Sequence, residues 1–90
     1  MAKSGTTKPN KMLPQWKVYL LNDDNVQFKH VVKALMMISS MTEENATNIA
    51  KEANDNGKSI IMTTHLEKAE LIKDRFETCE PSISTKLEAA

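Results

Sequence analysis

The chain has 90 residues, and its 12 Lys and Arg are balanced by 12 Asp and Glu, so its formal net charge is zero. A folded chain of this length buries only about 60% of its unfolded surface, which allows one small domain. The basic residues are spread over several segments, so no nucleic-acid-binding patch is expected. No apolar run approaches the length of a membrane span or a signal-peptide core, and no membrane association is expected.

The cysteine and histidine content predicts no metal site and no cofactor. Cys79 is the single cysteine and has no partner for an internal disulfide, which fits a reducing, cytoplasmic location or an equivalent organelle space. His30, His65 and Cys79 lie far apart and lack the close spacing of zinc ligands. We expect His30 to face solvent and Cys79 to be a buried or inert thiol.

The first segment, Met1–Gln15, contains Gly, Pro and several Lys but almost no apolar side chain. It cannot bury enough surface to offset the entropy cost of ordering. We predict a flexible N-terminal tail over residues 1–15, followed by one domain over residues 16–90. Composition favours a passive leader over a segment that is offered to a partner.

The rest of the chain is organised around Trp16–Asp24, with the sequence WKVYLLNDD. Val18 and Leu20 alternate with other side chains and Leu21 makes the apolar run continuous, which predicts a largely buried strand. The strand ends in Asn22–Asp24, three short polar side chains in a row. This junction places carboxylates and an amide at a loop rim above an apolar floor.

Two helices are predicted after this strand. The first begins near Val26 and has Asp24 or Asn25 as a suitable N-cap. The second is capped by Thr42 and ends before Gly57, which suits a left-handed C-terminal position. The apolar side chains of the first helix are Phe28, Val31, Val32, Leu35, Met36 and Ile38. Those of the second helix are Ala46, Ile49, Ala50 and Ala53.

A second strand is expected over Ser59–Thr64, which is mostly β-branched. Thr64 and Glu67 then fit a capping box that opens a third helix, and Pro81 marks its end. The inward side chains of this helix are Leu66, Ala69, Ile72 and Phe76. Ser82–Leu87 can form a last strand. The resulting order, β-α-α-β-α-β, predicts an α+β domain with a small sheet covered by helices.

The polar residues after the first strand allow three interpretations. Asp23 and Asp24 could hold a magnesium ion beside a phospho-acceptor, but the repeated βα units of such domains are missing. Asn22 and Asp24 could instead accept hydrogen bonds from a ligand ammonium set over an apolar cavity, each worth roughly 1.5–3 kcal/mol when well made. By residue type alone, simple helix capping by Asp24 is favoured over both.

The order WKVYLLNDDNVQFKHVVKALM, GKSIIMTTHLEKAELIK and LEAA resembles the ClpS family of protease adaptors, without a gap from Trp16 through Phe76. The resemblance implies a three-stranded antiparallel sheet packed against three helices, similar to the C-terminal domain of the bacterial ribosomal stalk protein. It also implies an adaptor, not an enzyme: a monomer that binds substrates through a bulky hydrophobic N-terminal residue, an N-degron of the N-end rule. The implied partner is a Clp-type AAA+ unfoldase, similar to ClpA or ClpC, to which substrates are delivered for degradation.

The resemblance also assigns binding residues. Asn22 and Asp24 match the family's α-amino-binding positions, whereas Asn54 stands where the family has a His. Phe28 replaces the usual Met, and Ala50 and Ala53 replace the larger Met and Val, so the family's preference for a first residue does not transfer. The implied side-chain pocket is formed by Leu20, Leu21, Val26, Phe28, Val31, Ala50 and Ala53.

The third predicted helix carries the implied docking surface for the unfoldase. Glu67 and Glu70 match acidic docking positions, while Ile72 replaces a usual Lys and Lys73 lies beside it. The tail Met1–Gln15 corresponds to the family's N-terminal extension, which assists delivery. The main alternative is a diverged paralogue that binds another peptide or only regulates the unfoldase, and the magnesium-dependent phospho-acceptor is a more distant one.

Overall fold

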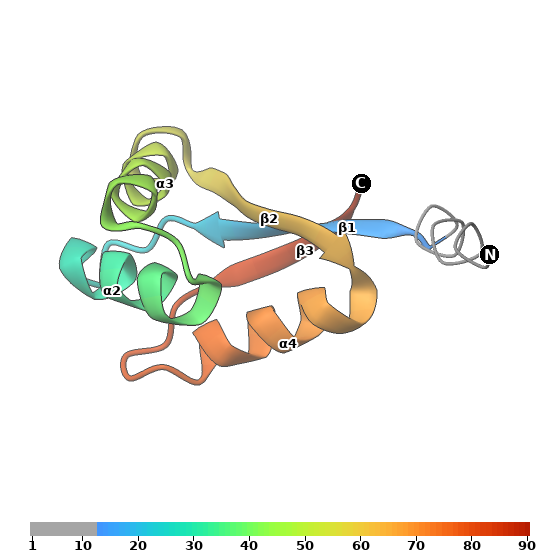
Figure 1. The fold of residues 1–90 in the computed structure, drawn as a ribbon. Coiled ribbons are helices and arrows are strands. Elements are labelled where there is room, and N and C mark those ends of the chain that lie inside the picture. Colours follow the sequence, from blue (N-terminus) through green and yellow to red (C-terminus); the bar gives the residue numbers. More distant parts are fainter. Residues whose placement is uncertain (1–12) are drawn as a thin grey trace.

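The computed structural model describes residues 13–90 and contains three strands and three helices (Figure 1). They follow in the order β1 (Gln15–Leu21), α2 (Phe28–Ser39), α3 (Glu43–Asn56), β2 (Lys58–His65), α4 (Leu66–Glu77) and β3 (Thr85–Ala89). The predicted order β-α-α-β-α-β is therefore confirmed. Most of the predicted N-terminal tail lies outside the described residues, and Gln15, assigned to the tail, is the first residue of β1.

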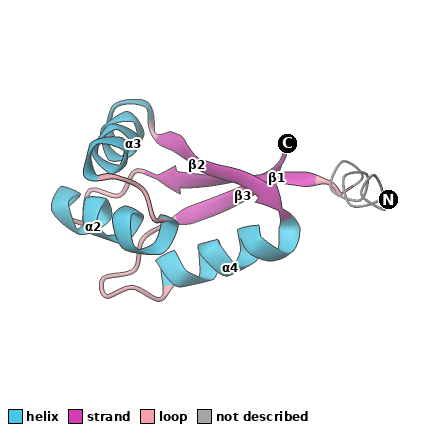
Figure 2. Cartoon of the chain, viewed as in Figure 1, coloured by secondary structure: helices cyan, strands magenta, loops and turns pink. Residues whose placement is uncertain are grey.

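The sheet is antiparallel throughout, with β1 in the centre between β2 and β3. Helix α4 packs against all three strands, α3 packs against β1 and β2, and α2 packs against α3 and α4. Figure 2 shows α4 running along the sheet, while α2 and α3 lie at the end toward which β1 points. Because β1 is bonded on both edges, it carries its C-terminal residues into the space beside α2 and α3 at a fixed position.

The core is built from the inward side of this central strand and from the helices that cover it. Val18 and Leu20 of β1 are buried, as are Leu35 of α2 and Phe76 of α4. Ile83, which precedes β3, completes the cluster. Burial of such apolar side chains contributes roughly 1.5–3 kcal/mol each relative to exposure, so these contacts fix how α2 and α4 sit on β1.

Helix α3 begins and ends as its sequence predicts. The Oγ1 atom of Thr42 accepts a hydrogen bond from the backbone N–H of Asn45 at 3.2 Å. At the other end, Gly57 has φ +95° and its N–H donates to the carbonyl oxygen of Ala53 at 2.8 Å. These two local caps set the length of α3 and thereby the position of Asn54 in its last turn.

Two predicted helix caps were wrong. The residue before α2 is Gln27, and its side chain makes no capping hydrogen bond; neither Asp24 nor Asn25 takes that place. Helix α4 is capped by His65, whose Nδ1 accepts from the backbone N–H of Lys68 at 3.4 Å, instead of by Thr64. Strand β2 continues through His65 and so includes Thr64, which moves the start of α4 one residue further along the chain.

Two predicted positions in the last third of the chain also differ. Leu66 is 39% exposed instead of inward, because it lies about 60° around α4 from the buried Ala69, at the edge of the apolar stripe. The last strand begins at Thr85, not at Ser82. The backbone N–H of Ile83 donates instead to the carbonyl oxygen of Phe76 at 3.0 Å, so this segment still completes the end of α4.

The predicted solvent-facing position of His30 was wrong as well. Its Nε2 lies 2.9 Å from the carbonyl oxygen of Pro81, and the side chain is half-buried between α2 and the segment that follows α4. Cys79 is partly buried, and its Sγ donates to the carbonyl oxygen of Arg75 at 3.4 Å. Both contacts hold the α4–β3 connection against the helices.

Candidate functional site

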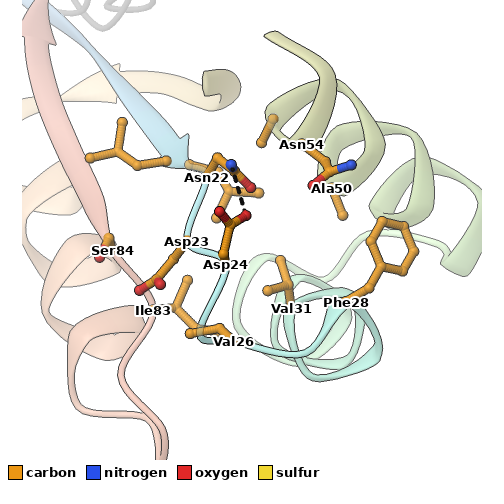
Figure 3. A pocket seen from close by; sticks show the side chains of 13 residues that line it. Asn22, Asp23, Asp24, Val26, Phe28, Val31, Ala50, Asn54, Ile83 and Ser84 are labelled. Carbon is orange, nitrogen blue, oxygen red and sulfur yellow. Dashed lines mark hydrogen bonds between the residues drawn. The ribbon is translucent and has the colours of Figure 1, made fainter. Parts of the chain in front are cut away.

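A cavity of about 180 Å³ lies at the C-terminal end of β1, between α2 and α3 (Figure 3). Leu20 and Leu21 line it from β1, and α2 and α3 supply the facing walls. An apolar cavity of about 150 Å³ is large enough to hold benzene, so this one can accept a single bulky side chain. All seven residues predicted for a side-chain pocket line it: Leu20, Leu21, Val26, Phe28, Val31, Ala50 and Ala53.

The walls of the cavity differ in size and exposure. Ala50 and Ala53 of α3 are 4% and 2% exposed, so this wall is made of buried methyl groups and lies close to the helix backbone. Phe28, at the start of α2, is 47% exposed and stands at the mouth of the cavity (Figure 3). The small α3 wall leaves room for a ligand side chain, while the Phe28 ring narrows the approach.

Polar side chains surround the opening. The Nδ2 of Asn22 donates to Oδ1 of Asp24 at 3.4 Å, and both side chains are exposed. This contact turns the amide nitrogen of Asn22 toward Asp24, so the amide oxygen and the second carboxylate oxygen remain free to accept hydrogen bonds. Asn54 lines the same cavity from α3, on the side facing Asn22 (Figure 3). The opening therefore presents oxygen acceptors, among them the Asp24 carboxylate, above an apolar floor.

Backbone hydrogen bonds hold this rim on both sides. The N–H of Leu21 donates to the carbonyl oxygen of Ser84 at 3.0 Å, and the N–H of Asn22 donates to the carbonyl oxygen of Gly57 at 2.9 Å. Asn22 is therefore fixed between the start of β2 and the segment before β3. These two bonds hold the backbone from which the Asn22 side chain extends at a fixed place on the rim.

Three further residues line the cavity that were not predicted for it: Asp23, Ile83 and Ser84. Asp23 shapes the loop through two hydrogen bonds. Its Oδ1 accepts from the backbone N–H of Asn25 at 2.9 Å, and its carbonyl oxygen accepts from the backbone N–H of Val26 at 3.1 Å. Its position beside Asp24 was a usable sequence signal. Ile83 and Ser84 carried none, because they come from the segment before β3 and reach the cavity only through the tertiary fold.

The carboxylates at this end of the sheet are not accompanied by further metal ligands. Among residues 13–90, no three His, Cys, Asp or Glu side chains gather in a group that could hold a metal ion. Within the same residues, no helix is long and apolar enough to cross a membrane. The described part of the chain therefore offers the cavity and its rim as the principal candidate site.

The two glutamates predicted to dock an unfoldase lie elsewhere. Glu67 and Glu70 are exposed on α4, and neither lines the cavity. Ile72, which stands at the position of a usual Lys, is 5% exposed and belongs to the core, so it presents no charge on this surface. Lys73 is engaged by Glu77 one turn along the helix. The docking role of this helix stays a prediction.

Comparison with known proteins places the chain in a family. The model of the family "ATP-dependent Clp protease adaptor protein ClpS" matches residues 11–89. An ATP-dependent Clp protease adapter protein ClpS of Synechococcus sp. is 34% identical over 77 residues, covering 84% of this chain and 85% of that protein. The chloroplastic adapter CLPS1 of Arabidopsis thaliana is 38% identical over 64 residues, covering 70% of this chain and 40% of that protein.

The fold is shared with a solved structure. The structure of Agrobacterium tumefaciens ClpS2 bound to L-phenylalaninamide superimposes with a TM-score of 0.80, covering 86% of this chain and 98% of that one at 20% sequence identity. Three helices and a three-stranded antiparallel sheet in the order β-α-α-β-α-β are shared with it. Sequence, fold and the extent of the matches agree, and the chain belongs to the ClpS family of adaptor proteins for the ATP-dependent Clp protease.

Proposed function

We propose that this adaptor captures substrate proteins by a bulky hydrophobic N-terminal residue and delivers them to a Clp-type AAA+ unfoldase. The observation that carries the proposal is the cavity at the end of β1, where oxygen acceptors of Asn22 and Asp24 stand above an apolar interior. Only a free N-terminus offers an ammonium group and an apolar side chain on the same carbon atom. A cavity of about 180 Å³ suits one such side chain.

The α-amino group would be held by the rim. Asn22 contributes an amide oxygen and Asp24 a carboxylate, which are acceptors for the donors of an ammonium group. Asn54, facing them from α3, contributes a neutral amide as a third, weaker partner. L-phenylalaninamide, the ligand of the Agrobacterium relative, carries a free amino group next to a benzyl side chain and so has the chemistry that this rim and cavity would accept.

The side chain of the first residue would enter between α2 and α3. Leu20, Leu21 and Val31 give it apolar contacts, and each buried methylene contributes about 0.8 kcal/mol. The small Ala50 and Ala53 wall extends the cavity toward α3 and suits Leu, Phe, Tyr or Trp in preference to small residues. The proposal includes no covalent chemistry, so the protein acts as an adaptor and not as an enzyme.

Delivery requires a second surface, which we assign to α4. Glu67 and Glu70 are exposed there and stand apart from the cavity, so a substrate and an unfoldase could be bound together. The proposed partner is a ClpA-like or ClpC-like unfoldase, to which this protein would bind as a monomer in the cytoplasm. In a pull-down with such an unfoldase, a Glu67→Lys, Glu70→Lys variant should lose binding and yet keep its affinity for peptides.

Peptide binding tests the proposal directly. Labelled peptides that begin with Leu, Phe, Tyr or Trp are titrated with the protein and followed by fluorescence anisotropy, with free and with acetylated N-termini. Acetylation removes the charge and donors that the rim accepts, so the acetylated peptides should bind much more weakly. Equal affinity for free and acetylated peptides, or binding of neither, would show that the cavity does not recognise an N-terminus.

A further inference from the structure

A second depression adjoins the cavity. A groove of about 410 Å³ lies between α2 and α3, and Phe28 lines both the groove and the cavity. Among residues 13–90, no other residue lines both. The Phe28 ring, which is 47% exposed, forms the boundary between them. A chain whose first residue occupies the cavity can therefore continue over this ring into the groove.

The floor of the groove suits a short extended segment. Val32 and Met36 follow Phe28 at intervals of four residues, so the three side chains form one ridge along α2. From Phe28 to Met36 the helix rises roughly 12 Å. An extended peptide advances about 3.3 Å per residue, so this length corresponds to about three to four residues.

The α2 side of the groove carries two positive charges. Lys29 and Lys33 line it one helical turn apart, and both are exposed. Within residues 13–90, no carboxylate lies within ion-pair distance of either ammonium group. Glu43 lines the groove from α3, so two lysines and one glutamate leave a net charge of +1. The groove is thus positive, whereas Asp23 and Asp24 make the far side of the cavity negative.

We propose that this groove is a second subsite, which binds the residues immediately after the substrate's first residue and favours acidic side chains there. The inference rests on the proposed function. The ammonium group of the substrate would lie toward Asp24, while an acidic side chain at the second to fourth residue would lie toward Lys29 and Lys33. Charges in the protein would match those in the substrate along the direction of the chain.

A set of peptides with a single acidic residue at different positions tests where the subsite lies. Peptides begin with Phe and continue with Ser, and a single Asp is moved from the second to the eighth residue, with a C-terminal label for anisotropy. Exposed ion pairs contribute about 0.2–1 kcal/mol, which corresponds to roughly 1.4-fold to fivefold per pair. Asp at the second to fourth residue should tighten binding within this range over Ser, and Asp at the seventh or eighth should not.

Lysine variants test the residues responsible. The double variant Lys29→Gln, Lys33→Gln should abolish the gain from Asp, measured as the ratio of the affinities of the Asp and all-Ser peptides for that same variant. Lys51→Gln, Lys68→Gln is the matched control, since it removes the same charge from exposed positions that line neither the cavity nor the groove. The control should keep the gain. Raising the salt from 50 to 300 mM should reduce the gain in the native protein.

The outcomes separate the two proposals. Free-amine peptides that bind with no dependence on the position of Asp, or a gain that survives Lys29→Gln, Lys33→Gln, would overturn the groove subsite and leave the proposed function standing. A gain lost equally in the Lys51→Gln, Lys68→Gln control would attribute the effect to net charge and would also overturn the subsite. Failure of every free-amine peptide to bind would overturn the proposed function, and the subsite with it.

Discussion

Replacing Asp24 by Asn removes one negative charge from the rim and keeps the shape of the side chain. A hydrogen bond to a charged group contributes about 1.5–3 kcal/mol, and the lower end applies because Asp24 is exposed to water. Since about 1.4 kcal/mol corresponds to a tenfold change in affinity, Asp24→Asn should weaken binding of a free-amine peptide about tenfold. The free energy of unfolding should hardly change, because the side chain accepts only a 3.4 Å bond from Asn22 among residues 13–90.

The assay compares free and acetylated forms of one Phe-initiated peptide by anisotropy, in a cycle with the native protein and the variant. The preference for the free peptide should shrink in Asp24→Asn by the same factor as the affinity falls. Asp23→Asn is the matched control: it removes an equal charge one residue away but keeps the Oδ1 atom that accepts from the N–H of Asn25. A larger loss in Asp23→Asn than in Asp24→Asn would refute the assignment of the amine-binding carboxylate.

Three further predictions concern α3 and its ends. Asn54→His introduces a side chain with an ordinary pKa near 6.5. The variant should lose peptide affinity between pH 7 and pH 5.5, because a cationic imidazole then faces the ligand ammonium, while the native protein, with a non-titrating amide there, keeps its affinity. Anisotropy titrations at both pH values measure this, and a flat profile in the variant would contradict it. The double variant Ala50→Met, Ala53→Val adds side-chain volume to the α3 wall of the cavity. Peptides that begin with Trp or Phe should therefore lose more affinity than those that begin with Leu, by roughly 1–3 kcal/mol per displaced methylene. An unchanged ranking in the same assay would mean that these positions do not set the size of the cavity. Gly57→Ala should lower the free energy of unfolding in urea by about 1–2 kcal/mol, because Gly57 has φ +95°. Within residues 13–90 no neighbouring atom lies within 4 Å of the added Cβ, so the expected cost is backbone strain. Unaltered stability would show that the turn relaxes without cost.

Features that depend on neighbouring residues were predictable from the sequence. The alternation in β1, the Thr42 cap and the Gly57 turn each involve side chains and backbone within a few residues, so their sequence signals are direct. The seven apolar residues of the cavity were assigned through the family resemblance, and the structure brings all seven together. Their role in binding a substrate stays a prediction that the peptide assays address.

Features that depend on distant residues were not predictable in this way. His30 has the spacing of a solvent-facing helix position, but Pro81 from the α4–β3 connection supplies an acceptor for its ring. Ile83 and Ser84 line the cavity because their backbone groups form hydrogen bonds with those of Phe76 and Leu21. No local sequence pattern predicts such pairings. Helix caps failed for a smaller reason, since several adjacent polar residues compete for the same position and tertiary packing decides among them.

The strand order β2-β1-β3 bears on how the protein matures during translation. Strand β1 emerges from the ribosome first, but the residues that hold its end, Gly57 and Ser84, are made much later. Until Ser84 has emerged, the N–H of Leu21 has no native partner and the rim cannot close. A nascent chain should therefore bind no substrate until the segment that contains Ser84 has been made and has paired with Leu21.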